Sequence, residues 1–175
     1  MKSKISLLFF LTMIFTSVAV MAMPTNIKIS VKTKDAKFLG TSMGGALVIL
    51  KDADTEETLA KGVTSGGTGN TKLIMNTPLT RGTAITDAKT ANFTTTIDID
   101  RPTLVEVTAF GPLSQRQAAN RVSATQWVMP GKDITGGDGW ILEIPGFVVD
   151  IQAPSNHIKL TGAQDVQIQA NLTMM

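Results

Sequence analysis

Side chains that could carry out catalysis are few in this chain, which has one histidine, His157, and no cysteine. A Ser–His–Asp or Cys–His arrangement needs a base, and His157 in the segment APSNHIKL is the one histidine that could serve. No G-x-S-x-G nucleophile motif accompanies it. A catalytic zinc normally takes three protein ligands, which a cysteine-free chain with one histidine does not readily supply. We therefore interpret His157 as a surface residue and predict no catalytic residue, no metal and no cofactor.

Alternating carboxylates form the second group of reactive side chains, with Asp52, Asp54 and Glu56 in one short stretch. Oxygen-rich turns bind calcium, but the EF-hand loop needs glycine at its sixth position, where this stretch has Glu57. Acidic residues between two apolar runs are typical of a solvated hairpin turn. We therefore interpret the stretch as a turn.

Paired carboxylates also catalyse glycoside hydrolysis, which leaves a hydrolase as one alternative function. Asp98 and Asp100 alternate along a predicted strand, and Asp150 lies in a later one. Nothing in their spacing selects an acid–base pair. Under this alternative, replacing these three residues with asparagine would remove activity.

Trp127 and Trp140 are the two tryptophans, and the chain contains no tyrosine. Both fit the core of a sheet protein, and both also fit a ligand or partner surface, because aromatic side chains anchor such sites. We take Trp127 and Trp140 as the candidate binding residues.

The elements that must position these residues are strands, because apolar and polar residues alternate with a period of two along most of the chain. Turn signals rich in Gly, Pro and Asn separate the segments. Together they predict an all-β, antiparallel sandwich of transthyretin or immunoglobulin-like type with seven to nine strands. Residues 113–122 fit either a helix or a loop that leads into the next strand, and residues 76–93 are predicted to be a long surface loop. The clearest strand segments are residues 27–32, 93–100, 102–110, 121–129 and 166–172, and residues 45–65 are predicted to be a strand, a polar turn and a second strand.

The densest apolar stretch, ITGGDGWILEIPGFVVDIQAPS, covers residues 134–155. Alternation places Trp140, Leu142 and Ile144 on one face of a first strand. After Pro145-Gly146, it places Phe147, Val149 and Ile151 on one face of a second strand, opposite Val148 and Asp150. Pro-Gly favours a type II turn, which does not match a tight hairpin, so we expect a bend or a change of sheet there. We expect the two apolar faces to be core. Ile141 and Val148 would then lie on outer faces covered by another element or by a partner.

One segment resembles a known family. GALVILKDADTEETLAKGVTSGGTGNTKL, residues 45–73, resembles the first hairpin of carboxypeptidase regulatory-like domains, which are transthyretin-like sandwiches. Ala46, Val48 and Leu50 match its first strand. Residues 52–57 match its acidic turn, and residues 59–64 its returning strand. The resemblance implies an exported sandwich module that binds, spaces or assembles and is not an enzyme.

The N-terminus, MKSKISLLFFLTMIFTSVAVMAMPTN, has the basic start, apolar run and small-x-small site of a cleaved signal peptide ending at Ala22. Residues 1–22 are therefore predicted to be a bacterial signal peptide, and residues 23–175 a single domain without a membrane span. Without a cysteine the chain is not a lipoprotein, so we expect a periplasmic or secreted protein.

Charge argues against a nucleic-acid partner. The chain has 16 Lys and Arg against 14 Asp and Glu, and the signal peptide removes Lys2 and Lys4 and no acid. The remaining 14 of each sign give a formal net charge of zero, whereas nucleic-acid binding needs clustered positive charge.

The C-terminal sequence VQIQANLTMM ends within a predicted strand. If that strand lies at a sheet edge, another chain can pair with it by strand addition. The function that the sequence favours is an exported, non-enzymatic binding or assembly module that meets a protein partner or its own copies. The contact would be a sandwich surface or an edge strand. A structural surface or fibre subunit is the first alternative, and the carboxylate-dependent hydrolase is the second.

Overall fold

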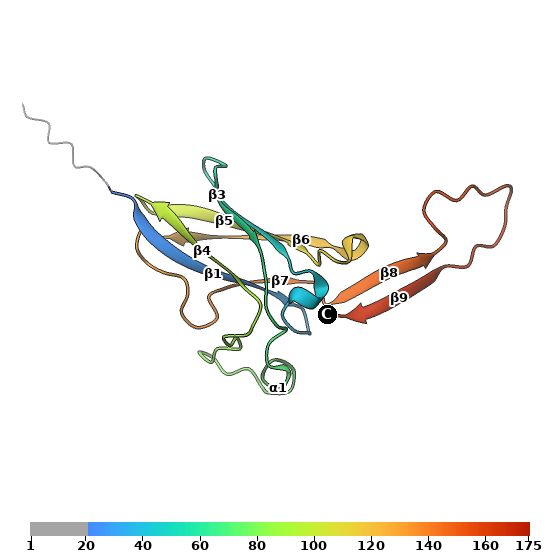
Figure 1. Ribbon diagram of the computed structural model, residues 1–175, viewed down its shortest axis with the longest axis horizontal. Coiled ribbons are helices and arrows are strands. Elements are labelled where there is room, and N and C mark those ends of the chain that lie inside the picture. The colour runs from blue at the N-terminus through green and yellow to red at the C-terminus, as the bar shows by residue number, and fades with distance from the viewer. Residues whose placement is uncertain (1–20) are drawn as a thin grey trace, which may run out of the picture.

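The computed structural model describes residues 21–175, which form two stacked sheets and a separate two-stranded hairpin (Figure 1). The predicted signal peptide lies almost entirely outside these described residues. Within them, no helix is long and apolar enough to cross a membrane.

The first sheet has three strands in the order β4 (Phe93–Ile99), β1 (Met23–Thr33) and β7 (Trp140–Ile144). β1 runs antiparallel to β4 and parallel to β7. Alternate residues of a strand point to opposite faces, and Ile27, Ile29 and Val31 of β1 all point inward and are buried.

The second sheet has four strands in the order β3 (Thr58–Val63), β2 (Leu47–Asp52), β5 (Thr103–Gly111) and β6 (Asn120–Val128). Every neighbouring pair in it is antiparallel. Its inner face is built from β-branched and small residues that favour a pleated, buried surface. The buried hydrophobic residues of β2 and β5 are Val48, Leu50, Val105, Val107 and Ala109.

The inner faces of the two sheets share one hydrophobic core, which confirms the predicted all-β sandwich. Phe93, Thr95, Ile97 and Ile99 form the inward-facing side of β4. The buried face predicted for Trp140, Leu142 and Ile144 is likewise confirmed.

A small second cluster covers the outer face of the three-stranded sheet. Phe38, Ile74 and Ile85 form it, and Ile141 of β7 packs against it. Ile74 lies on the short helix α1 (Thr71–Met75). The prediction that another element covers Ile141 is therefore confirmed. The loop carrying Ile85 is held by Asp138, whose Oδ1 accepts hydrogen bonds from the backbone N–H groups of Ile85 and Thr86, both at 2.8 Å.

Within residues 21–175, the remaining helical segments are two single turns of 3-10 helix, η1 (Thr41–Met43) and η2 (Arg116–Ala118). Of the two alternatives for residues 113–122, the helix was wrong and the loop leading into a strand is confirmed: β6 begins at Asn120, because the alternation of its Val and Thr residues fits a sheet better than a helix.

The hairpin consists of β8 (Phe147–Ala153) and β9 (Gln169–Met174), joined by a loop over residues 154–168. The predicted change of sheet at Pro145-Gly146 is confirmed, because β7 belongs to the sandwich and β8 does not. The last strand begins three residues later and ends two residues later than the predicted range of 166–172. The predicted orientation of β8 was wrong. The face with Phe147, Val149 and Ile151, which was predicted to be core, is about half exposed, and Val148, which was predicted to lie on an outer face, is buried in the main core. The reason is that β8 leaves the sandwich, so no second sheet covers that face.

Candidate interaction surface

The hairpin, residues 147–174, is called the arm below, and its base is fixed in the end of the sandwich. Val148 and Met175 are 2% and 6% exposed and belong to the main core. The backbone N–H of Met175 donates to the carbonyl of Gly146 at 3.0 Å, and the N–H of Lys37 donates to the carbonyl of Met175 at 3.4 Å. The arm therefore leaves the sandwich, called the body below, at a buried, hydrogen-bonded base and extends away from it (Figure 1).

One face of the arm is entirely apolar. Its residues form three cross-strand pairs, each with one residue from β8 and one from β9. The five large side chains are between 47% and 63% exposed, and the sixth residue, an alanine, is also exposed. These six residues, called the arm face, are Phe147 with Met174, Val149 with Leu172, and Ile151 with Ala170.

The hydrogen-bonding pattern brings the paired side chains of the arm face close together. In an antiparallel ladder, hydrogen-bonded pairs alternate with non-hydrogen-bonded pairs, whose side chains lie closer. The bond between Met175 and Gly146 makes that pair a hydrogen-bonded one. The next pair along the ladder, Phe147 with Met174, is then a non-hydrogen-bonded pair, and the pairs of Val149 and Ile151 follow in the same phase. The arm face is therefore a continuous apolar strip.

Apart from the buried Val148 at the base, the paired residues on the opposite side of the arm are polar, and this side is held by η2. Gln117 Nε2 donates to Asp150 Oδ1 at 2.9 Å, and the backbone N–H of Ile151 donates to Gln117 Oε1 at 3.1 Å. The Gln117 amide thereby occupies the outer edge of β8 at Ile151, where another strand would otherwise pair. This contact fixes the direction of the arm and leaves the arm face pointing away from η2.

Replacing Gln117 with alanine is expected to loosen the arm without unfolding the sandwich. Amide hydrogen exchange at Ile151 should rise roughly fivefold, because a hydrogen bond of this kind contributes about 1 kcal/mol. Gln115→Ala is the matched control, since Gln115 precedes the same turn and its side chain forms no hydrogen bond among the described residues. Equal exchange at Ile151 in both variants would show that Gln117 does not hold the arm.

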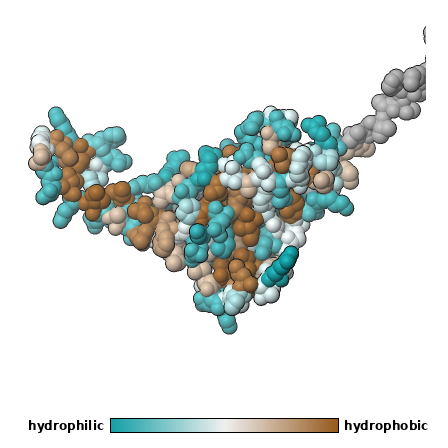
Figure 2. All heavy atoms as spheres, turned by 180° about the vertical axis from the view of Figure 1, so that it is seen from behind, coloured by the Kyte–Doolittle hydropathy of each residue, from teal (hydrophilic) through white to brown (hydrophobic). Residues whose placement is uncertain are grey.

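Apolar side chains continue into the loop at the tip of the arm, where four more are exposed: Ile158, Leu160, Val166 and Ile168. Figure 2 shows hydrophobic residues gathered along the arm, apart from those on the body. A two-stranded hairpin is marginally stable by itself in water, and contiguous exposed apolar patches mark interaction sites. The arm therefore has the properties of a contact surface.

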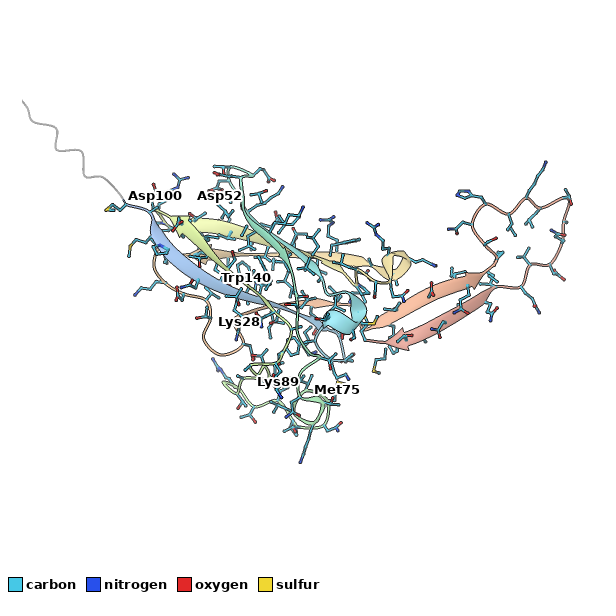
Figure 3. The ribbon with its side chains drawn as sticks, viewed as in Figure 1. Lys28, Asp52, Met75, Lys89, Asp100 and Trp140 are labelled. Atoms are coloured by element: carbon cyan, nitrogen blue, oxygen red, sulfur yellow. The ribbon has the colours of Figure 1, made fainter. Side chains whose placement is uncertain are left out.

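The structure does not bring the two tryptophans together. Trp140 lies on β7 between the two sheets, is 7% exposed and belongs to the main core (Figure 3). Trp127 lies on the outer face of β6, is 58% exposed and pairs with Leu104 of β5. A single surface formed by both side chains is not possible in this fold.

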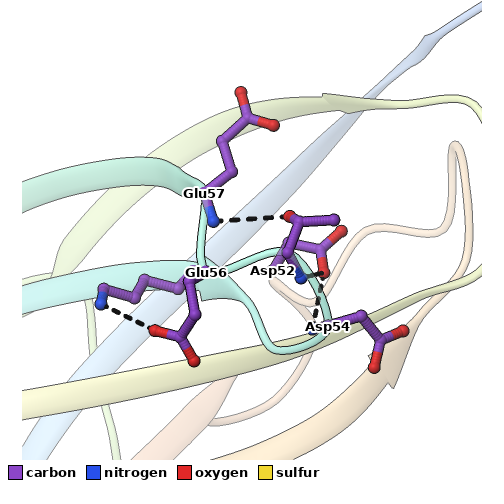
Figure 4. Close-up of polar contacts among 6 residues, drawn as sticks. Asp52, Asp54, Glu56 and Glu57 are labelled. Atoms are coloured by element: carbon purple, nitrogen blue, oxygen red, sulfur yellow. Dashed lines mark hydrogen bonds and ion pairs between the residues drawn. The ribbon is translucent and has the colours of Figure 1, made fainter.

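The acidic stretch closes the β2–β3 turn, as the sequence predicts (Figure 4). Asp52 Oδ1 accepts hydrogen bonds from the backbone N–H groups of Asp54 at 2.8 Å and Thr55 at 3.0 Å. Lys51 Nζ pairs with Glu56 Oε2 at 3.1 Å on the surface. These carboxylates are thus used within the turn itself.

Of the other carboxylates singled out by the sequence, Asp150 lies far from Asp98 and Asp100. Asp98 and Asp100 lie at the end of β4, and Figure 3 shows Asp100 at the opposite end of the body from the arm, which carries Asp150. His157 is exposed in the tip loop. Among the described residues, no three His, Cys, Asp or Glu side chains gather as a metal site.

Three carboxylates that accept hydrogen bonds, those of Asp52, Asp87 and Asp133, lead to a prediction for the stability of the fold at low pH. Backbone N–H groups of Thr55 and Asp54 lower the pKa of Asp52 below its ordinary value of 3.8. The Thr90 hydroxyl and the N–H of Lys89 do the same to the pKa of Asp87. The backbone and side-chain amides of Asn26 lower the pKa of Asp133.

Because the folded-state pKa of each group is lowered, its stabilising effect is present above pH 3.8 and is lost as the pH falls through the folded-state pKa. Unfolding midpoints in urea should therefore decline below about pH 4. A variant with asparagine at positions 52, 87 and 133 should decline less steeply. Asp98→Asn, on the exposed face of β4, is the control and should follow the wild-type curve. Parallel curves for wild type and triple variant would contradict this assignment.

No family model, curated protein or solved structure matches the chain. The resemblance of residues 45–73 to carboxypeptidase regulatory-like domains stays a prediction. Export to the periplasm or the medium also stays a prediction.

Proposed function

We propose that this protein is a non-enzymatic assembly module, exported from the cell, that binds a protein partner through the arm face. The observation that carries the proposal is an apolar strip of six exposed residues on an arm whose base is buried in the core. A rigidly held apolar surface loses little conformational freedom on binding, which favours affinity.

The energetic argument rests on the exposed area of the arm face. Burying a large apolar side chain contributes about 1.5–3 kcal/mol, so covering five that are half exposed contributes on the order of 4–7 kcal/mol. Part of this is offset by the entropy lost on association. The surplus is of the size that supports a specific complex, whereas single exposed apolar residues on the body, such as Trp127, offer far less.

Photo-cross-linking in cells of the source organism tests the proposal. A photoreactive amino acid at position 149 should give a covalent adduct with a protein. The same amino acid at position 61, on the exposed strand β3 far from the arm, should give none. Absence of any adduct from positions 147, 149 and 172 would refute the arm as an interaction surface, whatever the partner.

A further inference from the structure

We propose that the partner of the arm is the arm of a second copy of this chain. This inference rests on the proposed function and makes it more specific. The two arm faces pack against each other with the arms antiparallel, about a two-fold axis that crosses the middle pair, Val149 and Leu172.

The chemistry of the arm face fits a second copy of itself. A two-fold contact places the same patch on both sides, so the patch must be complementary to itself. A charged patch would meet its own sign across such an axis, at considerable cost. The arm face is uncharged, and the charged Asp150 lies on the opposite side of β8, where Gln117 binds it.

Side-chain size along the arm face also fits an antiparallel pair. Near the base the pair is large, Phe147 with Met174, and further out it is smaller, Ile151 with Ala170. An axis across the middle pair lays Phe147 of one copy over Ile151 of the other, and Met174 over Ala170. Large side chains then face smaller ones across the sheet spacing of about 10 Å, which is how packed layers interdigitate.

The shape of the molecule selects the antiparallel arrangement over the parallel one. The body lies at one end of the arm (Figure 1). Parallel arms would bring both bodies to the same end, and would stack Phe147 against Met174 of the other copy. Antiparallel arms place the bodies at opposite ends, so the two bodies do not compete for the same space.

The exposed area sets how far the arms must overlap. Five half-exposed side chains of this size present about 400 Å² per copy, or about 800 Å² for two, against the ~1,000 Å² of a specific interface. The four tip-loop side chains, between 38% and 73% exposed, supply the remainder. With the axis at the middle pair, residues 147–151 of the two copies face each other, and each tip loop extends past the base of the other arm to the adjoining end of the other sandwich, which covers these four side chains.

Pairing between two β9 edges is the competing arrangement. β9 is the open side of the two-stranded hairpin, because Gln117 occupies the edge of β8. Edge pairing would extend the sheet to four strands and leave both arm faces exposed to water. It would not bury the apolar surface that distinguishes the arm, so we favour face-to-face packing.

Single cysteines test the arrangement without interference, because the chain has none of its own. Val149→Cys places one thiol at the axis on the arm face, and disulfides do join the facing sheets of sandwich domains. Thr173→Cys is the matched control, since it lies on β9 on the opposite side of the arm. After mild oxidation of the purified protein, covalent dimer should be at least about tenfold more abundant for Val149→Cys.

Two other outcomes would overturn the inference of an arm-to-arm dimer packed face to face. If Leu172→Cys cross-links and Val149→Cys does not, β9 edges pair, because Val149 then lies about 14 Å from its copy, three strand spacings away. If light scattering finds the reduced variants monomeric at every concentration, the arm does not self-associate. Photo-cross-linking from position 149 then decides separately whether the proposed function survives with a different partner.

Discussion

Val148→Asp is expected to destabilise the protein by at least about 3 kcal/mol, because it places an unpaired charge in a buried site. Val148 is 2% exposed and packs in the main core at the base of the arm. Urea unfolding followed by tryptophan fluorescence measures the loss. The largest effect should fall on the arm and on the adjoining end of the sandwich.

Val149→Asp, one residue further along β8, is expected to leave the unfolding free energy within about 0.5 kcal/mol of wild type. It should instead weaken self-association at least about 100-fold, because two aspartates meet at the axis and the apolar strip is broken. Sedimentation velocity over a dilution series measures this. If both variants lose stability equally, β8 does not have one buried and one open face. If Val149→Asp assembles as wild type does, the arm face is not the contact.

Trp140→Ala is expected to lower the unfolding free energy by about 3–5 kcal/mol, because it empties a large volume in the core. Trp127→Ala removes the same side chain from the exposed face of β6 and should change stability by about 0.5 kcal/mol or less. Urea denaturation of both variants, followed by far-UV circular dichroism, compares them. Similar losses for the two would contradict the placement of Trp140 inside the sandwich and Trp127 outside it.

Much of the sandwich could be predicted from the sequence because side-chain alternation is a local property. Ile27, Ile29 and Val31 alternate with polar residues, and β1 buries them. The acidic turn after β2 could be predicted for the same reason, since Asp52 bonds to residues two and three positions later. Such features depend on neighbours in the chain.

The arm could not be predicted in this way. Alternation shows that Phe147, Val149 and Ile151 share a face, but it does not show what covers that face. Trp140, Leu142 and Ile144 have the same pattern, and they are buried because β7 pairs with β1 inside the sandwich. The bend at Pro145-Gly146 was the one local signal that the next strand leaves the sheet.

Contacts between residues far apart in the chain also could not be predicted from the sequence. The parallel pairing of β1 with β7 joins segments more than 100 residues apart. Asp138 organises the loop at Ile85 and Thr86, and Gln117 holds β8. Each contact depends on the finished fold, and no spacing within the sequence specifies it.

Light scattering of the unmodified protein over a wide range of concentration tests the central claim most directly. The arm-to-arm dimer predicts a mass of two chains that falls towards one on dilution, while Val149→Asp stays at one chain throughout. A wild-type protein that keeps the mass of a single chain at every concentration, as Val149→Asp does, would contradict it.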